Sequence, residues 1–181
     1  MSRLQVGEKI PDFTFDTPFE SGLSYWHIAS LHRHTALVFL RYYGCTLCQL
    51  DIHDYAASYD LIRNQDAQLL VVLQSDPKAL AEQLKMPDAL PFRLICDPQK
   101  KLYAQFDIMP AESREKMFSP DVLVKIARAK KEGYSHGKYE GDELQLPAAF
   151  ITDAEGMIAY AHYASKVADV PSAADLARLM Q

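Results

Sequence analysis

The chain has 181 residues, a hydrophobic content of 49% and a formal net charge of −5 at pH 7. These values fit one soluble globular domain, residues 1–181, with a sizeable core. The acidic balance argues against nucleic acid as a partner, because phosphates need a basic surface. No apolar run approaches the roughly 18 residues of a membrane span, and the amino terminus lacks the apolar segment of a secretion signal. We therefore expect a cytoplasmic protein with no membrane partner.

The first part of the chain leads into a buried strand and a helix. Residues 6–19 alternate loosely around two prolines, which predicts a short edge strand or hairpin. Residues 21–35 are polar and rich in histidine, so we expect a loop or a single turn. Residues 36–40 form a continuous apolar run, typical of a strand buried on both faces. A helix with a ragged apolar stripe is predicted from residue 45 to about Arg63.

The middle of the chain repeats this strand–helix rhythm. Residues 68–74 predict a second buried strand, and Asp76–Pro77 is a favourable start for a short helix that ends near Lys85. Residues 92–96 predict a third strand. Residues 101–106 predict one or two helical turns. This alternation is typical of an α/β fold.

Residues 107–145 interrupt the rhythm. Ser119–Pro120 predicts a helix start and Gly133 its end. The apolar face of this helix is predicted to contain Val122, Leu123, Ile126 and Ala129. The basic residues Lys125, Arg128, Lys130 and Lys131 are interpreted as a solvated face. Residues 134–143 should form a polar loop, and Tyr134, His136 and Tyr139 could let it cover a site as a lid.

The end of the chain predicts two strands and a helix. Residues 148–152 and 157–163 form a hairpin pattern around a short turn. The last amphipathic helix, residues 171–180, is expected to turn Leu176 and Leu179 inward. The complete order predicts a central mixed sheet with helices on both faces.

Cys45 and Cys48 lie where the predicted central strand passes into the helix. A separation of three residues puts both side chains on one helical face, close enough for a disulfide. Cys45 would lie at the amino end of the helix, whose free N–H groups and dipole favour a thiolate. Thiols in such C-x-x-C pairs have pKa values of roughly 3.5 to 7. The motif therefore predicts redox chemistry, with Cys45 as the reachable nucleophile and Cys48 as its buried partner.

Two other interpretations of the cysteines remain open. They could be inert apolar residues, as we expect of Cys96. They could also form half of a zinc site with His27 and His32, which have ligand-like spacing, or with His34. These histidines precede the cysteines, however, and a whole strand separates the two groups. We therefore prefer the redox interpretation and expect neither a metal nor a cofactor.

The motifs Gly44-Cys45-Thr46-Leu47-Cys48 and Leu146-Pro147-Ala148-Ala149-Phe150-Ile151 carry a wider resemblance. Together with PFRLICDPQKKLYAQFDI and GDELQLPAAFITDAEGMIAYAHY, they resemble the thioredoxin superfamily. Within it the chain looks most like the peroxiredoxin-like branch of the alkyl hydroperoxide reductase/thiol-specific antioxidant (AhpC/TSA) family. The resemblance covers nearly the whole chain. It implies a thioredoxin-like fold with an N-terminal extension and a helical insertion, residues 107–145, before the final hairpin.

The chain departs from the peroxiredoxin pattern at important positions. Peroxiredoxins have a proline seven and a threonine three residues before the peroxidatic cysteine. Counted from Cys48 these positions hold Arg41 and Cys45, and counted from Cys45 they hold Val38 and Tyr42. A later peroxiredoxin arginine is replaced by a proline, as in thioredoxin-like reductases. The resemblance to those reductases favours dithiol exchange.

The resemblance also implies roles around the two cysteines. Gly44, Leu146 and Pro147 would bind the substrate, with a cis bond before Pro147 presenting a backbone edge to an extended chain. Arg41 would stabilise a thiolate or a peroxide, or else pair with solvent or a surface carboxylate. The aspartate that accepts a proton in thioredoxins falls at a phenylalanine here. Asp51 could replace it, although a solvated Asp51 is the simpler expectation.

Three functions follow, in order of preference. The first is thiol–disulfide exchange in redox homeostasis, in which Cys45 attacks a disulfide and Cys48 resolves the mixed disulfide. The second is a peroxiredoxin-like thiol peroxidase in which the sulfenic acid of Cys45 is trapped by Cys48. The third is a non-catalytic redox-sensing or zinc-binding module. For either enzyme we expect a thioredoxin- or glutathione-type electron donor, and a homodimer is compatible with each.

Overall fold

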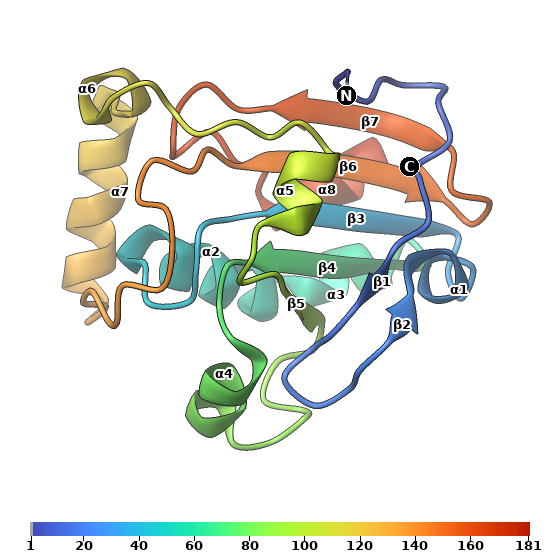
Figure 1. Ribbon diagram of the computed structural model, residues 1–181, viewed down its shortest axis with the longest axis horizontal. Coiled ribbons are helices and arrows are strands. Elements are labelled where there is room, and N and C mark those ends of the chain that lie inside the picture. The colour runs from blue at the N-terminus through green and yellow to red at the C-terminus, as the bar shows by residue number, and fades with distance from the viewer. Residues whose placement is uncertain (1) are drawn as a thin grey trace.

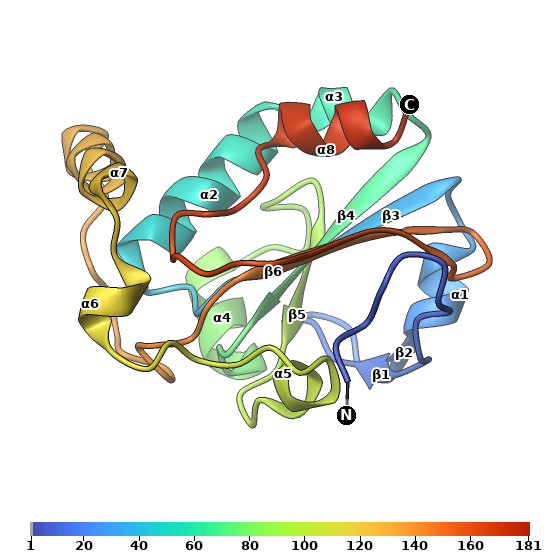
Figure 2. The same ribbon diagram turned by 90° about the horizontal axis from the view of Figure 1, so that it is seen from above.

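The structure is a computed structural model that describes residues 2–181, and it contains a five-stranded sheet with helices on both faces (Figures 1 and 2). The strands are β3 (His34–Phe39), β4 (Ala67–Leu73), β5 (Arg93–Cys96), β6 (Ala148–Asp153) and β7 (Ile158–Tyr163). Their order is β5-β4-β3-β6-β7. β3, β4 and β5 are parallel, whereas β6 is antiparallel to β3 and β7 to β6. The predicted mixed sheet of a thioredoxin-like α/β fold is confirmed.

The two central strands are covered on both faces. All seven residues of β4 and five of the six residues of β3 are buried, as their continuous apolar sequences predict. Phe39, the last residue of β3, is aligned with Val72 of β4 and with Ala148, the first residue of β6. The end of β3 and the start of β6 therefore lie side by side, at the same ends of these two inner strands. The C-x-x-C turn follows β3 at this end of the sheet.

Eight helices and a small hairpin surround the sheet among the described residues. The helices are α1 (Tyr25–Ala29), α2 (Thr46–Ala57), α3 (Tyr59–Arg63), α4 (Pro77–Leu84), α5 (Lys101–Gln105), α6 (Arg114–Met117), α7 (Pro120–Lys131) and α8 (Ala173–Leu179). The hairpin pairs β1 (Thr14–Phe15) with β2 (Leu23–Ser24). In Figure 2, α2, α3 and α8 cover one face of the sheet, and α1 and α5 lie on the other.

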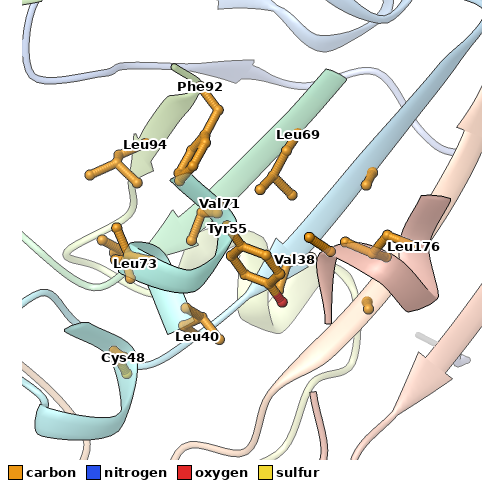
Figure 3. Close-up of a cluster of buried hydrophobic side chains, with 14 of the residues drawn as sticks. Val38, Leu40, Cys48, Tyr55, Leu69, Val71, Leu73, Phe92, Leu94 and Leu176 are labelled. Atoms are coloured by element: carbon orange, nitrogen blue, oxygen red, sulfur yellow. The ribbon is translucent and has the colours of Figure 1, made fainter. Parts of the chain in front are cut away.

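One apolar cluster lies between α2, the helix that carries the C-x-x-C motif, and the sheet. Tyr55 of α2 and Leu176 of α8 pack with Val38 of β3, and Cys48 lies at the end of this cluster beside Leu40 (Figure 3). The Tyr55 hydroxyl donates a hydrogen bond to the Pro171 carbonyl at 2.7 Å, which ties α2 to the segment before α8. Helix α2 is therefore held by both packing and hydrogen bonding.

Several sequence expectations were wrong in detail. The single helix expected up to Arg63 is divided at Ser58. The loop or single turn expected within residues 21–35 contains α1, a helix of five residues. The α6 helix was not predicted. Leu123 and Leu179 were expected to point inward, but they are 65% and 42% exposed. Leu123 belongs to α7 and Leu179 to α8, and only a narrow stripe of each helix packs on the rest of the protein. Both side chains lie beside that stripe and remain exposed to solvent. No helix formed by residues 2–181 has the length and apolar character to cross a bilayer.

Candidate active site

Cys45 is the residue that begins the C-x-x-C helix. It is the N-cap of α2, and its Sγ accepts a hydrogen bond from the Cys48 backbone N–H at 3.3 Å. Cys48 follows in the first turn, and both cysteines carry free thiols. The sulfur of Cys45 thus takes the place of the oxygen that Ser or Asp supplies at ordinary helix starts. This position brings the helix dipole and free backbone N–H groups to bear on one sulfur.

Arg41 lies directly against this sulfur. It follows the end of β3, and its Nη2 donates a hydrogen bond to Cys45 Sγ at 3.0 Å. Its Nη1 donates to the carbonyl of Glu143 at 2.7 Å and lies 3.6 Å from the Glu143 carboxylate. The guanidinium is therefore fixed from two sides. Contact with a thiol and pairing with a carboxylate were expected as alternatives for Arg41, and the structure contains both contacts.

The two thiols have opposite pKa shifts. Burial raises the pKa of Cys45, but the hydrogen bonds from Cys48 and the charge of Arg41 outweigh it and bring the pKa to about 6. Burial and the neighbouring Cys45 raise the pKa of Cys48 well above its ordinary value. At neutral pH the pair therefore holds one thiolate and one thiol. This is the state needed for attack by the first sulfur and later reaction of the second.

Residues 134–145, which we call the cover loop, lie over the C-x-x-C turn. In Figure 1 they form the orange segment between α7 and β6, beside the start of α2. The Gly137 N–H donates to the Gly44 carbonyl at 2.8 Å, and the Gly44 N–H donates to the Glu140 carboxylate at 2.9 Å. A Cβ atom at Gly44 would lie 2.2 Å from the Lys138 carbonyl oxygen. Glycine is therefore required here by close approach of two backbones.

The cover loop makes one sequence expectation wrong. Cys45 was expected to be reachable, but it is 0% exposed, and Cys48 is 4% exposed. Residues 134–145 cover the sulfur in this structure. Of the three aromatic residues named for a lid, His136 contacts Tyr42 in the turn between β3 and α2, and Tyr139 stacks on His136.

A buried hydroxyl fastens the cover loop to the β3–α2 turn. The Tyr42 hydroxyl donates to the Glu143 carboxylate and lies 3.1 Å from His136 Nε2. Tyr42, Glu140 and Glu143 were not among the predicted site residues. Tyr42 stands in the motif region and could have been considered from the sequence. Nothing in the sequence indicates that two acidic residues about one hundred positions later contact that region.

The expected substrate edge at Pro147 is not present. No peptide bond among residues 2–181 is cis, so the expected cis bond before Pro147 was wrong. Pro147 is buried, and its carbonyl accepts a hydrogen bond from Ala164 N–H at 3.1 Å. Leu146 is half-buried, with its carbonyl near the Gln145 side chain at 3.1 Å. The β6 strand already has neighbours on both sides, which leaves no edge there for an added strand.

Asp51 is neither a solvated residue nor a partner of Cys48. It is buried, and its carboxylate pairs with Lys125 of α7 at 2.5 Å. Burial raises its pKa despite the charge of Lys125. Next along α2, Asp54 pairs with Arg128 of α7 at 2.7 Å. Two of the basic residues interpreted as a solvated face thus attach α7 to α2.

The histidines considered for a zinc site lie away from the cysteines. His34 begins β3, and His27 belongs to α1, whereas Cys45 and Cys48 follow the opposite end of β3. Within residues 2–181 no group of three or more histidine, cysteine or acidic side chains is arranged to hold a metal ion. Cys96 is buried at the end of β5, and burial raises its pKa to about 12.

Solved structures share this fold. Peroxiredoxin 6 of Arenicola marina is 11% identical and has a TM-score of 0.72, with 98% of this chain and 72% of that chain covered. The yeast mitochondrial 1-Cys peroxiredoxin is 12% identical, with a TM-score of 0.69 and coverage of 98% and 75%. The Plasmodium vivax 2-Cys peroxiredoxin is 14% identical, with a TM-score of 0.67 and coverage of 97% and 79%. No curated protein matches the sequence.

The sheet order and these neighbours together define a thioredoxin-like fold, the fold that peroxiredoxins share. The particular family follows from the sequence itself. Residues 6–161 match the AhpC/TSA family, and the chain belongs to that family of antioxidant oxidoreductases. The resemblance found in the sequence motifs is thereby confirmed.

Proposed function

We propose that this protein is a thiol peroxidase in which Cys45 reduces a hydroperoxide and Cys48 resolves the oxidised sulfur. The observation that carries the proposal is the contact of Arg41 Nη2 with Cys45 Sγ at 3.0 Å. A permanent positive charge on this sulfur stabilises the thiolate, and a guanidinium can also donate to peroxide oxygens. The family supports the same chemistry, although Arg41 precedes the cysteine and the usual proline and threonine are missing.

The oxidative step transfers one oxygen to sulfur. The Cys45 thiolate attacks one oxygen of the hydroperoxide, the O–O bond breaks, and a sulfenic acid forms. The other oxygen leaves as an alkoxide or hydroxide and takes up a proton to become an alcohol or water. Arg41 would stabilise the negative charge as it moves from sulfur to the leaving oxygen. A thiolate with a pKa of about 6 is present in sufficient amount at neutral pH.

The second step closes a disulfide within the motif. The Cys48 sulfur attacks the sulfenic acid of Cys45, and water leaves with the thiol proton. Because both side chains lie in the first turn of α2, the sulfurs can join with little backbone movement. Two thiols of a thioredoxin- or glutathione-type donor then reduce the disulfide by exchange. The yeast mitochondrial neighbour is described as resolved through glutathione/thioredoxin systems.

Thiol–disulfide exchange with a protein substrate is less well supported as the main activity. The trans bond and the occupied carbonyl at Pro147 remove the expected docking edge. Thiol–disulfide exchange still occurs in the proposed cycle, in the step that reduces the Cys45–Cys48 disulfide.

A stopped-flow experiment with hydrogen peroxide tests the proposal. The reduced protein should form one sulfenic acid, trapped by a dimedone probe on Cys45 in the Cys48→Ser variant. Wild-type protein should instead form a Cys45–Cys48 disulfide, and Cys45→Ser should lose peroxide consumption altogether. Cys96→Ser serves as the matched control and should retain the wild-type rate. If peroxide consumption persists in Cys45→Ser, or if insulin disulfides are reduced faster than peroxide, the proposal is wrong.

A further inference from the structure

The cover loop places two of its oxygen atoms on N–H groups beside Cys45. One is a carboxylate oxygen of Glu140, which accepts from the Gly44 N–H at 2.9 Å. The other is the carbonyl oxygen of Glu143, which accepts from Arg41 Nη1 at 2.7 Å. Gly44 immediately precedes Cys45, and the same Arg41 guanidinium touches its sulfur. Two donors next to the sulfur are thus occupied by oxygens that belong to the chain itself.

A third donor near the sulfur has no acceptor. Arg41 Nε is buried and finds no hydrogen-bond partner among residues 2–181. A buried N–H without an acceptor lowers the stability of a fold, because its hydrogen bond to water is lost and not replaced. Such groups in folded proteins call for an explanation, and a ligand that supplies the missing acceptor is one. The guanidinium therefore has one N–H to spare for an oxygen atom.

We propose that the cover loop is an internal competitor of the substrate, whose Glu140 and Glu143 oxygens occupy the Gly44 and Arg41 donors that bind hydroperoxide oxygens when the loop moves away. The inference rests on the proposed peroxidase function. Gly44 N–H and Arg41 then form a binding site for the two oxygens of the O–O group. The substrate class is a neutral hydroperoxide, which presents oxygen acceptors without bringing a further negative charge beside the thiolate.

The contacts of the cover loop suit it to opening. Residues 134–145 contain neither helix nor strand, and residues 135–139 are exposed. Polar contacts hold its part nearest Cys45, at Gly44, at Tyr42 and at Gln74, whose side-chain oxygen accepts from the Asp142 N–H at 2.8 Å. Only its last two residues join the core, where Leu144 packs on the apolar cluster and Gln145 is buried. Segments with few apolar contacts open at lower free energy than the packed core of a fold. Opening would expose the sulfur and free both donors together.

Glu140→Ala is the variant that tests the inference, because it removes one competing oxygen and leaves Cys45, Cys48 and Arg41 unchanged. Rates are measured at pH 8.5, where the Cys45 thiol is fully ionised and a change in its pKa has little influence. Two reagents are used, iodoacetamide to report access to the sulfur and hydrogen peroxide to report the reaction. We expect both second-order rate constants to rise about 10-fold, which corresponds to about 1.4 kcal/mol.

Gly44→Ala is the second variant, and Glu82→Ala is the control. The added Cβ would meet the Lys138 carbonyl at 2.2 Å and displace the cover loop while keeping the Gly44 N–H. Gly44 lacks a positive φ, so its own backbone conformation is open to alanine and the clash falls on the cover loop. It should increase both rates, as Glu140→Ala does. Glu82 is exposed on α4, and its replacement should leave both rates at the wild-type value.

The outcomes separate failure of the inference from failure of the proposed function. Unchanged alkylation in both variants would show that the cover loop is no barrier and would overturn the inference. Faster alkylation with an unchanged or lower peroxide rate would show that the loop covers the sulfur without competing for peroxide, which also overturns it. If wild type and variants are alkylated but none consumes peroxide, the peroxidase function itself is wrong.

Discussion

The β3–α2 turn, residues 40–48, and the cover loop meet over Cys45, but the protein holds them in different ways. The turn is continuous with a strand paired on both sides and with a helix packed on the core. The cover loop has no regular structure and is held through polar contacts at Gly44, Tyr42, Arg41 and Gln74. Apolar burial and paired strands fix the sulfur, whereas a few hydrogen bonds decide whether it is covered.

This difference separates two properties of the site. The turn sets the ionisation of Cys45 through the N-cap position and Arg41. The cover loop sets access to the sulfur, and it also supplies the Glu143 carbonyl that holds Arg41. Mutations on the two sides should therefore affect different measurements. Substitutions in the contacts that support α2 should lower the free energy of unfolding. Substitution of Arg41 should shift the pKa of Cys45, and substitutions in the contacts of the cover loop should alter the access of reagents to its sulfur.

The largest effect is expected from Lys125→Ala, which breaks the support of α2 by α7. The substitution leaves the carboxylate of Asp51 buried without its partner. Removing one member of a buried ion pair is strongly destabilising, and we expect a loss of about 3 kcal/mol in the free energy of unfolding. Urea denaturation at pH 7 measures it. The deficit should shrink as the pH falls, because protonation of Asp51 removes the unpaired charge.

Lys131→Ala is the matched control for this prediction. Lys131 is exposed at the end of the same helix, so its replacement should change the free energy of unfolding by no more than about 0.5 kcal/mol. Equal losses in the two variants would mean that the Asp51–Lys125 pair does not anchor α7.

Arg41→Ala addresses the ionisation of the sulfur. Without the guanidinium, the charge and the hydrogen bond by which Arg41 lowers the pKa of Cys45 are lost, so this pKa should rise from about 6. The thiolate fraction at pH 7 then falls, and we expect the rate with hydrogen peroxide to drop on the order of 100-fold. The pH profile of the rate should move from a midpoint near 6 to a higher pH. Thiolate absorbance at 240 nm measures the same shift independently.

Arg93→Ala is the control. Arg93 begins β5, at the opposite end of the sheet from the C-x-x-C turn, and pairs with Glu20. It should keep the wild-type profile. A wild-type profile in Arg41→Ala as well would show that the helix start alone lowers the pKa of Cys45.

The sequence predicted the turn side of the site far better than the loop side. The continuous apolar runs identified β3 and β4, and the C-x-x-C spacing placed Cys45 at a helix start, because these features depend on local pattern. The same reasoning missed Glu140 and Glu143, since their contacts with Gly44 and Tyr42 depend on how a long insertion returns to the sheet. The cis bond before Pro147 was carried over from a resemblance, and the structure shows that this bond is trans.

The smallest expected effect, and the finest test of the difference between turn and loop, comes from Tyr42→Phe. The change keeps the buried ring but removes the hydroxyl that joins Glu143 and His136 to the turn. Loss of one hydrogen-bonded group costs about 1 kcal/mol. If this group holds the cover loop, the cost falls on the closed state, and alkylation of Cys45 at pH 8.5 should become about 5-fold faster. Tyr160→Phe on β7 removes a hydroxyl elsewhere and should have no such effect. A Tyr42→Phe protein that is less stable to urea yet alkylated at the wild-type rate would place the hydroxyl in the fold of the turn and not in the closure of the loop.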